Sequence, residues 1–159
     1  MYTYMSDDVG AADFAGCLAG NLRAAARVVT RAYDAALRPH GVRITQIAIL
    51  TTVRRLQPAT TTRLAADLAG ERSAVTRDVA LLERTGLLAS APRPGDGRAR
   101  ELSITAAGEA VLARCAPAWY EVQRTSREAI GAERADELVA LAGALVAALG
   151  PTAVAGAGS

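Results

Sequence analysis

Residues 60–86, TTTRLAADLAGERSAVTRDVALLERTG, contain two short amphipathic segments with Gly70 between them. Thr60 or Thr61 can cap a first helix, which Gly70 ends, and Ser73 can cap a second helix. The apolar positions that recur at helical spacing and are expected to face inward are Leu64, Ala65, Leu68, Val75, Val79, Leu81 and Leu82. Two short helices joined by a tight turn that contains glycine predict a helix-turn-helix.

The next segment predicts a β-hairpin with a basic, glycine-rich tip. An apolar run occupies residues 87–91, and apolar and polar side chains alternate over residues 99–104. Between them, residues 92–98 read PRPGDGR, a composition typical of a turn. A helix-turn-helix followed by such a hairpin is a winged helix.

Longer helices are expected on both sides of this unit. Residues 13–37 contain no proline and repeat apolar side chains every three or four positions, so they predict one long helix that ends before Pro39. A second helix is expected over about residues 45–56. After the hairpin, Thr105 can cap a further helix, in which Pro117 can introduce a bend.

A last helix is expected from about Ala132 to the Gly150–Pro151 pair. It places an apolar stripe on one face, made of Leu138, Leu141, Ala142, Leu145 and Leu149. This stripe has to be buried, and the chain's own core is the simplest place for it.

Composition sets limits on the class of protein. The 159 residues are 51% apolar and 21% charged, which predicts one globular domain or a compact pair of subdomains. The longest apolar run, residues 138–149, is shorter than the roughly 20 residues that cross a bilayer. Two cysteines make no disulfide framework, and no secretion signal opens the sequence, so we expect a cytoplasmic protein.

Charge is distributed unevenly along the chain, although its net value is only +2. Residues 1–20 contain three acidic and no basic side chains, whereas residues 21–63 contain eight arginines and one aspartate. All 18 basic residues are arginine, which fits either the recognition of phosphate and guanine or a GC-rich coding bias.

Nothing in the sequence indicates an enzyme. The single histidine, His40, and the nearer cysteine, Cys17, are separated by most of the first helix and cannot form a catalytic dyad within one chain. No cysteines have zinc-site spacing and no glycine loop can cradle a phosphate, so we expect no catalytic residue, no metal and no cofactor.

Several short motifs, taken in order and with their spacing, resemble the MarR family of transcriptional regulators over about residues 12–149. The motifs that carry the resemblance are Val29-Thr30-Arg31-Ala32-Tyr33-Asp34, Leu37-Arg38-Pro39-His40-Gly41, Thr62-Arg63-Leu64-Ala65, Ser73-Ala74-Val75-Thr76-Arg77, Leu82-Glu83-Arg84-Thr85-Gly86-Leu87, Asp96-Gly97-Arg98 and Leu102-Ser103-Ile104-Thr105-Ala106-Ala107-Gly108.

The resemblance implies a mainly α fold with a small β-hairpin, in which a winged helix-turn-helix is flanked by N- and C-terminal dimerisation helices. Residues 45–104 would form the winged-helix DNA-binding region, and residues 12–44 and 105–149 the helical dimerisation region. Residues 1–11 and 150–159 are expected to be disordered. The apolar stripe of the last helix would then be buried between two chains.

In such a fold, the first two turns of the second helix of the motif face the base edges of the major groove. Arg72 or Arg77 could donate two hydrogen bonds to a guanine, and Thr76 could meet a thymine methyl group. Alternatively, Ser73 is only a helix cap and Arg77 only pairs with a neighbouring aspartate.

The hairpin would clamp the DNA backbone or the minor groove through Arg98. Family members commonly have Asp-Arg-Arg where this chain has Asp96-Gly97-Arg98, so Arg93 and Arg100 are candidates to replace the missing arginine. The complete set of candidate DNA contacts is Thr61, Thr62, Arg63, Arg72, Ser73, Thr76, Arg77, Arg93, Arg98 and Arg100.

Members of this family typically respond to a small aromatic or phenolic ligand or to a thiol oxidant. Candidate ligand contacts are the scarce aromatic and basic residues Tyr33, His40, Trp119 and Tyr120, with Arg23 or Arg27 for an anionic group; each could instead serve only packing. The candidate redox residue is Cys17, near the start of the first helix, and Cys115 is a possible partner if the two α-carbons approach within about 7 Å.

The resemblance therefore implies a homodimeric regulator, expected to be a repressor, that binds a roughly palindromic operator in double-stranded DNA and is released by a small molecule. Peroxide sensing through Cys17 is the first alternative. A dimeric scaffold that does not bind DNA is the second.

Overall fold

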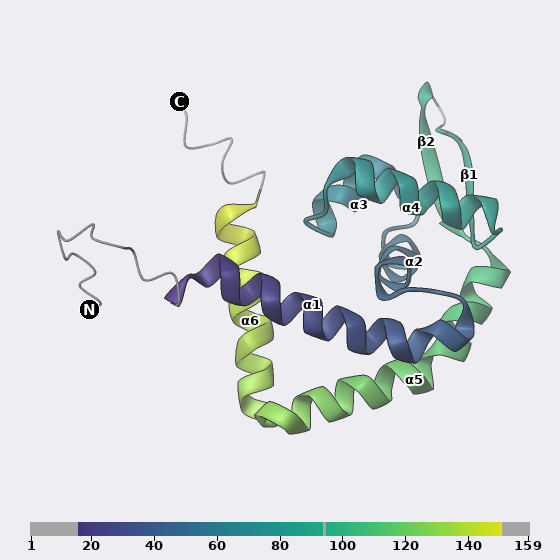
Figure 1. Cartoon of the computed structure of the whole chain (residues 1–159). Helices are drawn as coiled ribbons and strands as arrows, with labels where there is room; N and C mark the ends of the chain where they lie inside the picture. Colours follow the sequence, from purple (N-terminus) through teal and green to yellow (C-terminus); the bar gives the residue numbers. More distant parts are fainter. Residues whose placement is uncertain (1–15, 94, 151–159) are drawn as a thin grey trace, which may run out of the picture.

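The structure, a computed structural model, describes residues 16–93 and 95–150, and for residues 96–99 it describes only the backbone. Figure 1 shows a helical molecule from which one two-stranded hairpin projects. In chain order the elements are α1 Leu18–Leu37, the 3-10 turn η2 Arg38–His40, α2 Ile44–Leu56, α3 Thr61–Asp67, α4 Arg72–Arg84, β1 Leu88–Arg93, β2 Asp96–Ile104, α5 Ala106–Ile130 and α6 Ala132–Leu149. The predicted fold class, a winged helix-turn-helix between flanking helices, is therefore confirmed.

The first helix begins at Leu18 rather than at residue 13, and residues 13–15 lie outside the described ranges. Its end agrees with the prediction, because Pro39 lies in the 3-10 turn and Gly41 follows with a positive φ of 74°. That backbone conformation favours glycine. The predicted disordered segment 1–11 also lies outside the described part of the chain, as does the predicted segment 150–159 except for Gly150, which is the C-cap of α6.

The helix-turn-helix packs through the predicted apolar positions except Leu81; Leu68 is half-buried but packs against the core. Leu64, Val75 and Val79 are buried in the core. Leu81 is only half-buried, because it lies at the border of an open cleft between α4 and α1. The prediction that Leu81 faces fully inward was therefore wrong.

The hairpin has longer strands and a shorter turn than predicted. Pro92 pairs with Arg100 and Arg93 pairs with Asp96, with an irregularity in the register between the two pairs. Most of the predicted tip, residues 92–98, therefore belongs to the strands. Ala59 exchanges two backbone hydrogen bonds with Leu102, so the chain just before α3 extends the sheet and ties the hairpin to the helix-turn-helix.

The start of α5 lies very close to the base of the hairpin. Thr105 caps this helix, as predicted, by accepting a hydrogen bond from the N–H of Gly108 at 3.1 Å. A Cβ atom at position 108 would clash with the carbonyl oxygen of Leu87 and lie 2.7 Å from Cγ1 of Ile104. Only glycine permits this close approach.

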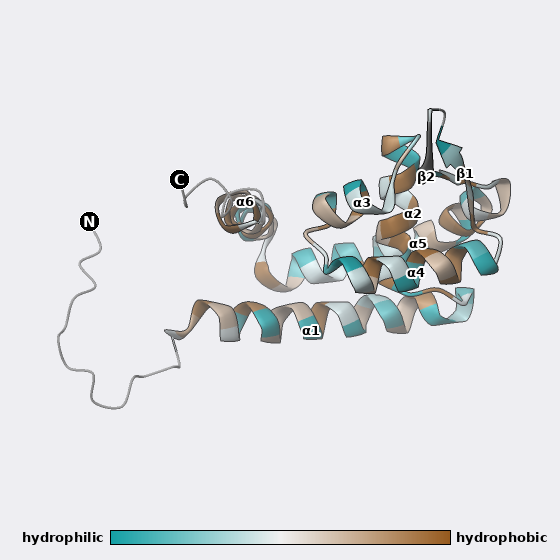
Figure 2. Ribbon diagram, turned by 90° about the horizontal axis from the view of Figure 1, so that it is seen from above, coloured by the Kyte–Doolittle hydropathy of each residue, from teal (hydrophilic) through white to brown (hydrophobic). Residues whose placement is uncertain are grey.

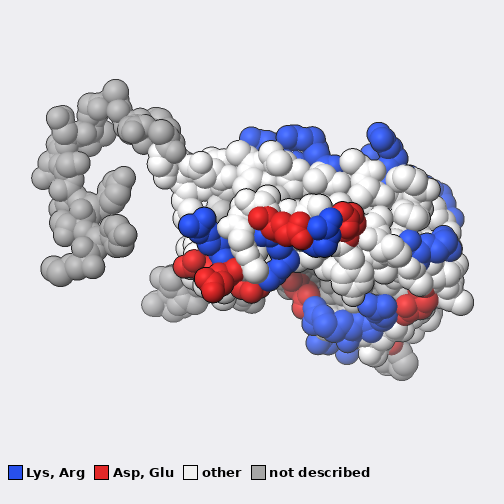
Figure 3. Space-filling view, turned by 90° about the horizontal axis from the view of Figure 1, so that it is seen from below, with Lys and Arg blue, Asp and Glu red and all other residues white. Residues whose placement is uncertain are grey.

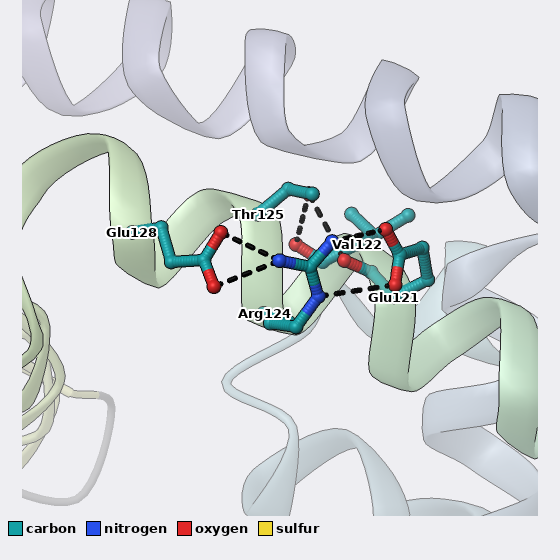
Figure 4. Close-up of polar contacts among 5 residues, drawn as sticks. All are labelled: Glu121, Val122, Arg124, Thr125 and Glu128. Carbon is teal, nitrogen blue, oxygen red and sulfur yellow. Dashed lines mark hydrogen bonds and ion pairs between the residues drawn. The ribbon is translucent and has the colours of Figure 1, made fainter.

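Helix α5 continues through Pro117 and changes direction along its length (Figure 1). Beyond the proline, Arg124 forms ion pairs with Glu121 at 2.6 Å and Glu128 at 2.7 Å, and the hydroxyl of Thr125 donates to the carbonyl of Glu121 at 3.0 Å (Figure 4). These contacts link successive turns on an exposed surface, so they add little to the stability of the fold.

The apolar stripe of α6 is not part of the core of this chain. Leu138, Leu141 and Leu149 are 50%, 56% and 70% exposed. Leu18 and Val28 on α1 are also exposed, and Figure 2 shows apolar colouring over much of α6 and along α1. Within the described residues, burial of the stripe inside the chain is therefore excluded.

Candidate nucleic-acid interface

The N-terminus of α4 is capped by Glu71, not by Ser73 as predicted. The Glu71 carboxylate accepts hydrogen bonds from the backbone N–H groups of Ser73 and Ala74, each at 3.0 Å. A carboxylate has two oxygens and a longer side chain than serine, so it reaches two N–H groups at once, and its charge favours the positive end of the helix. The helix therefore begins at Arg72.

The Ser73 hydroxyl also donates to Glu71. This bond is the main cause that holds the pKa of Glu71 below its usual value of 4.5, followed by the two backbone bonds. The Thr76 hydroxyl donates to the carbonyl of Arg72 at 2.8 Å. Both hydroxyl protons on this face are therefore committed within the protein, and what remains free for a base edge is their oxygen lone pairs and the Thr76 methyl group.

Arg72 and Arg77 project from the exposed N-terminal half of α4. Neither forms an ion pair with a described side chain. Asp67, a potential partner of Arg77, instead pairs with Arg55 of α2. The structure thus gives Arg77 no ion pair with Asp67, although the nearby Glu71 carboxylate interacts favourably with it.

The candidates on α3 lie at its start. Thr60 is the cap, since its hydroxyl oxygen accepts from the N–H of Arg63 at 3.2 Å. Thr61 is the first helical residue and is half-buried, while Thr62 and the Arg63 side chain are exposed.

The three hairpin arginines have different surroundings. Arg93 pairs with Glu101 at 3.6 Å. The Arg100 guanidinium donates to the Ser90 hydroxyl at 2.6 and 2.9 Å and to the Ser90 carbonyl at 3.1 Å. Arg98 lies in β2 near the turn, and its side chain is outside the described part of the structure.

The Ser90 hydroxyl in turn donates to Glu83 of α4. Arg100, Ser90 and Glu83 therefore form a chain of hydrogen bonds from the hairpin to α4. This chain ties the hairpin to α4, and it leaves Arg100, with its three hydrogen bonds to Ser90, less free than Arg93 to contact an external partner.

Figure 3 shows the basic side chains of one face in separate groups, with acidic side chains among them. This distribution matches the moderate net charge of +2.

A cleft of about 590 Å³ lies between α2 and α5. Of the predicted ligand contacts, Trp119 and Tyr120 line it. Tyr33 does not line it but contacts Trp119, with ring centroids 6.1 Å apart, and its hydroxyl donates to the side-chain oxygen of Gln123. Burial raises the pKa of the Tyr33 hydroxyl, so this hydroxyl stays protonated and serves as a structural donor.

The other predicted ligand contacts are not part of this cleft. Arg23 and Arg27 are exposed on α1, and His40 lies half-buried in the 3-10 turn. The sequence analysis missed Thr51 and Arg54 on α2 and Glu109 on α5, which line the cleft. Arg54 pairs with Glu109 at 3.4 Å, and only the packing of α2 on α5 brings these two residues together.

The two cysteines are free and differ in their surroundings. Cys17 occupies the N-cap position of α1 and is half-buried. Cys115 is buried beside the cleft, and this burial raises the pKa of its thiol, an effect that nearby Arg114 partly opposes. Cys17 is therefore the more accessible thiol.

Comparison with known proteins identifies the family. The sequence model of the MarR family matches residues 42–99. The M. tuberculosis transcriptional regulator MosR, solved in complex with DNA, is 31% identical, with a TM-score of 0.71 over 84% of this chain and 98% of the MosR chain. The chain belongs to the MarR family.

Two further structures share the fold of this MarR-family protein. The transcriptional repressor CouR, bound to a 23-mer DNA duplex, is 21% identical, with a TM-score of 0.76 over 87% of this chain and 99% of its own. Apo MarR from E. coli is 20% identical, with a TM-score of 0.67 over 81% and 96%. No curated protein sequence matches the chain.

Membership of the MarR family makes this protein a transcriptional regulator and not an enzyme. The helices described in the structure include none with the length and apolar character needed to cross a membrane.

Proposed function

We propose that this MarR-family protein is a homodimeric repressor that binds a palindromic operator in double-stranded DNA and is released by a small molecule. The observation that carries the proposal is the exposed N-terminal half of α4, where Arg72 and Arg77 have no ion-pair partner among the described side chains. MosR and CouR have been solved with DNA, which supports the same use of this fold here.

The dimer is supported by the exposed apolar side chains of α1 and α6. Such a surface on a soluble protein indicates an interface, and a second copy of the same chain is the commonest partner. Two-fold symmetry would place two copies of α4 in successive major grooves, with half-sites about one helical turn apart.

The effector site is proposed at the cleft between α2 and α5. Its volume of about 590 Å³ suits a small molecule, and Trp119 and Tyr120 offer aromatic surface. An acidic or phenolic group on the ligand could replace Glu109 as the partner of Arg54, since the existing pair is exposed and easily exchanged. An aromatic anion is therefore the proposed effector class.

Peroxide sensing remains the second candidate, because Cys17 is accessible whereas Cys115 is buried. Oxidation at the start of α1 would act on the proposed dimer interface.

The proposal is tested by selecting an operator from random duplexes and measuring its binding by fluorescence anisotropy over a salt series. We expect a dimer in sedimentation, with an affinity that falls steeply with salt because phosphate contacts release counterions. Arg77→Ala should weaken operator binding. The matched control is Arg84→Ala, at the opposite end of α4, which should bind as the wild type does. A monomer without salt-sensitive binding would instead support the scaffold alternative.

A further inference from the structure

A second cleft, of about 820 Å³, lies between the end of α1, the α1–α2 connection and α4. It shares no lining residue with the cleft between α2 and α5. Three arginines, Arg31, Arg38 and Arg43, line it, and no aromatic side chain does. Its chemistry is therefore cationic and polar, unlike that of the proposed effector site.

The three arginines have no ion-pair partner among the described side chains, although Asp34 lies at the right spacing to pair with Arg31 or Arg38. Asp34 lies three residues after Arg31 and four before Arg38, an arrangement that normally forms ion pairs along a helix. Instead, Oδ1 of Asp34 accepts a hydrogen bond from the backbone N–H of Ile44, the first residue of α2, at 2.8 Å. No described side chain forms an ion pair with any of the three arginines.

Gln46 places a further donor in the same cleft. The residue is only 8% exposed, and its side-chain oxygen accepts from the backbone N–H of Arg43 at 2.9 Å. Its amide nitrogen donates to no described atom, although the side chain lines the cleft. No buried side-chain nitrogen or oxygen of the described residues lacks a hydrogen-bond partner, so this nitrogen is open to the solvent of the cleft, where a ligand acceptor could also reach it.

The α4 side of the cleft has the opposite character. Asp78 lines this side, half-buried, and has no ion pair with a described side chain. A ligand that fills the cleft would therefore meet guanidinium and amide donors on the side of α1 and α2, and a carboxylate acceptor on the side of α4.

We propose that this cleft binds a small polyanion that also carries a hydroxyl group, of the sugar-phosphate or hydroxy-polycarboxylate class. Arg31 and Arg38 are two helical turns apart, about 10 Å along α1, so they suit two anionic groups on one molecule. The Gln46 amide donates to one of these groups, and the ligand hydroxyl donates to Asp78. Because the cleft joins α1 to α4, such a ligand would couple the proposed dimer helices to the proposed recognition helix.

The test uses isothermal titration calorimetry on the full chain without DNA, with citrate and ribose 5-phosphate as probes and acetate as the simple monoanion. We expect one saturable site per chain for at least one of the two probes and none for acetate. Binding of only one probe selects between carboxylate and phosphate chemistry and supports the site.

Two variants and one control locate the binding. Arg38→Gln should weaken it roughly tenfold, the usual effect of losing one charge-assisted hydrogen bond. Gln46→Glu keeps the acceptor for the Arg43 N–H but replaces the amide donor with a carboxylate, so the fold persists and binding is lost. Arg27→Gln, one turn before Arg31 on α1 and outside the cleft, should bind as the wild type does, and circular dichroism checks that all variants are folded.

The site is refuted if neither probe saturates, or if Arg27→Gln weakens binding as much as Arg38→Gln does, which would indicate diffuse attraction. Because these titrations contain no DNA, this failure leaves the proposed operator binding untouched, and a failure of operator binding leaves the cleft untouched.

Discussion

The carboxylate of Glu71 accepts hydrogen bonds from both the hydroxyl and the backbone N–H of Ser73. Glu71 therefore holds in place the Ser73 side chain, which the sequence analysis predicted to cap α4 or to contact DNA. A negative charge therefore lies at the end of the helix that is proposed to enter the major groove. Arg72 and Arg77 flank this charge, and Glu71 interacts favourably with Arg77. The charge at the start of α4 is thus set jointly by Glu71, Arg72 and Arg77.

The first prediction concerns this cap. Glu71→Ala should lower the melting temperature, because two backbone N–H groups lose their acceptor, whereas Glu71→Ser should retain most of it, since serine also caps helices. Circular dichroism during heating measures both. Equal destabilisation by the two variants would show that the carboxylate, and not capping in general, is required.

The same cap predicts a dependence on pH. The pKa of Glu71 is lowered in the folded protein, so its stabilising contribution is complete above the ordinary value of 4.5 and is lost as the pH falls below that value through the lowered pKa. In Glu71→Gln this part of the acid transition should be absent. Melting temperatures of the two proteins between neutral and acidic pH make the comparison, and parallel curves would contradict the prediction.

A third prediction separates base recognition from backbone contact. Thr76→Ala should lose about 1–3 kcal/mol mainly on the selected operator, whereas Arg98→Ala should weaken operator and random duplexes alike and reduce the salt dependence. Anisotropy titrations with both duplexes measure this. If Arg98→Ala changed only base preference, the hairpin would be reading sequence and its proposed role would be wrong.

A fourth prediction concerns the contact between the hairpin base and α5. Gly108→Ala should destabilise the fold by about 1–3 kcal/mol, because the new Cβ meets the Leu87 carbonyl and Ile104. Chemical denaturation measures the change. Gly143→Ala is the control, since nothing lies within 4 Å of a Cβ at that helical position, and it should not destabilise the isolated chain.

The last prediction tests the redox alternative. If Cys17 is the sensor, peroxide should release the operator from the wild type and from Cys115→Ser but not from Cys17→Ser, because only Cys17 is accessible. Operator release is followed by anisotropy after peroxide treatment. Release from all three proteins, or from none, removes Cys17 as the sensor and favours the small-molecule effector.

The helices and the hairpin follow from local sequence patterns. Apolar spacing, the Thr60 and Thr105 caps and the residues Pro39 and Gly41 act within one or two turns of chain, so they predict element type without knowledge of packing. The same local motifs were enough to indicate the family. Local patterns predict the ends of helices less well. At the start of α4 the prediction chose Ser73 as the cap, but Glu71, two residues earlier, also has a side-chain oxygen that can cap a helix and does so.

Tertiary structure alone decided which side chains became partners. Asp34 could have paired with Arg31 or Arg38 along its own helix, but the position of α2 gave it the N–H of Ile44, and this choice left the arginines unpaired around a cleft. Arg100 likewise became a link to Ser90 once β1 and β2 had paired. Local periodicity determines which face of a helix is apolar, but the partner of a charge depends on elements that are distant in the sequence, so the sequence by itself left these contacts open.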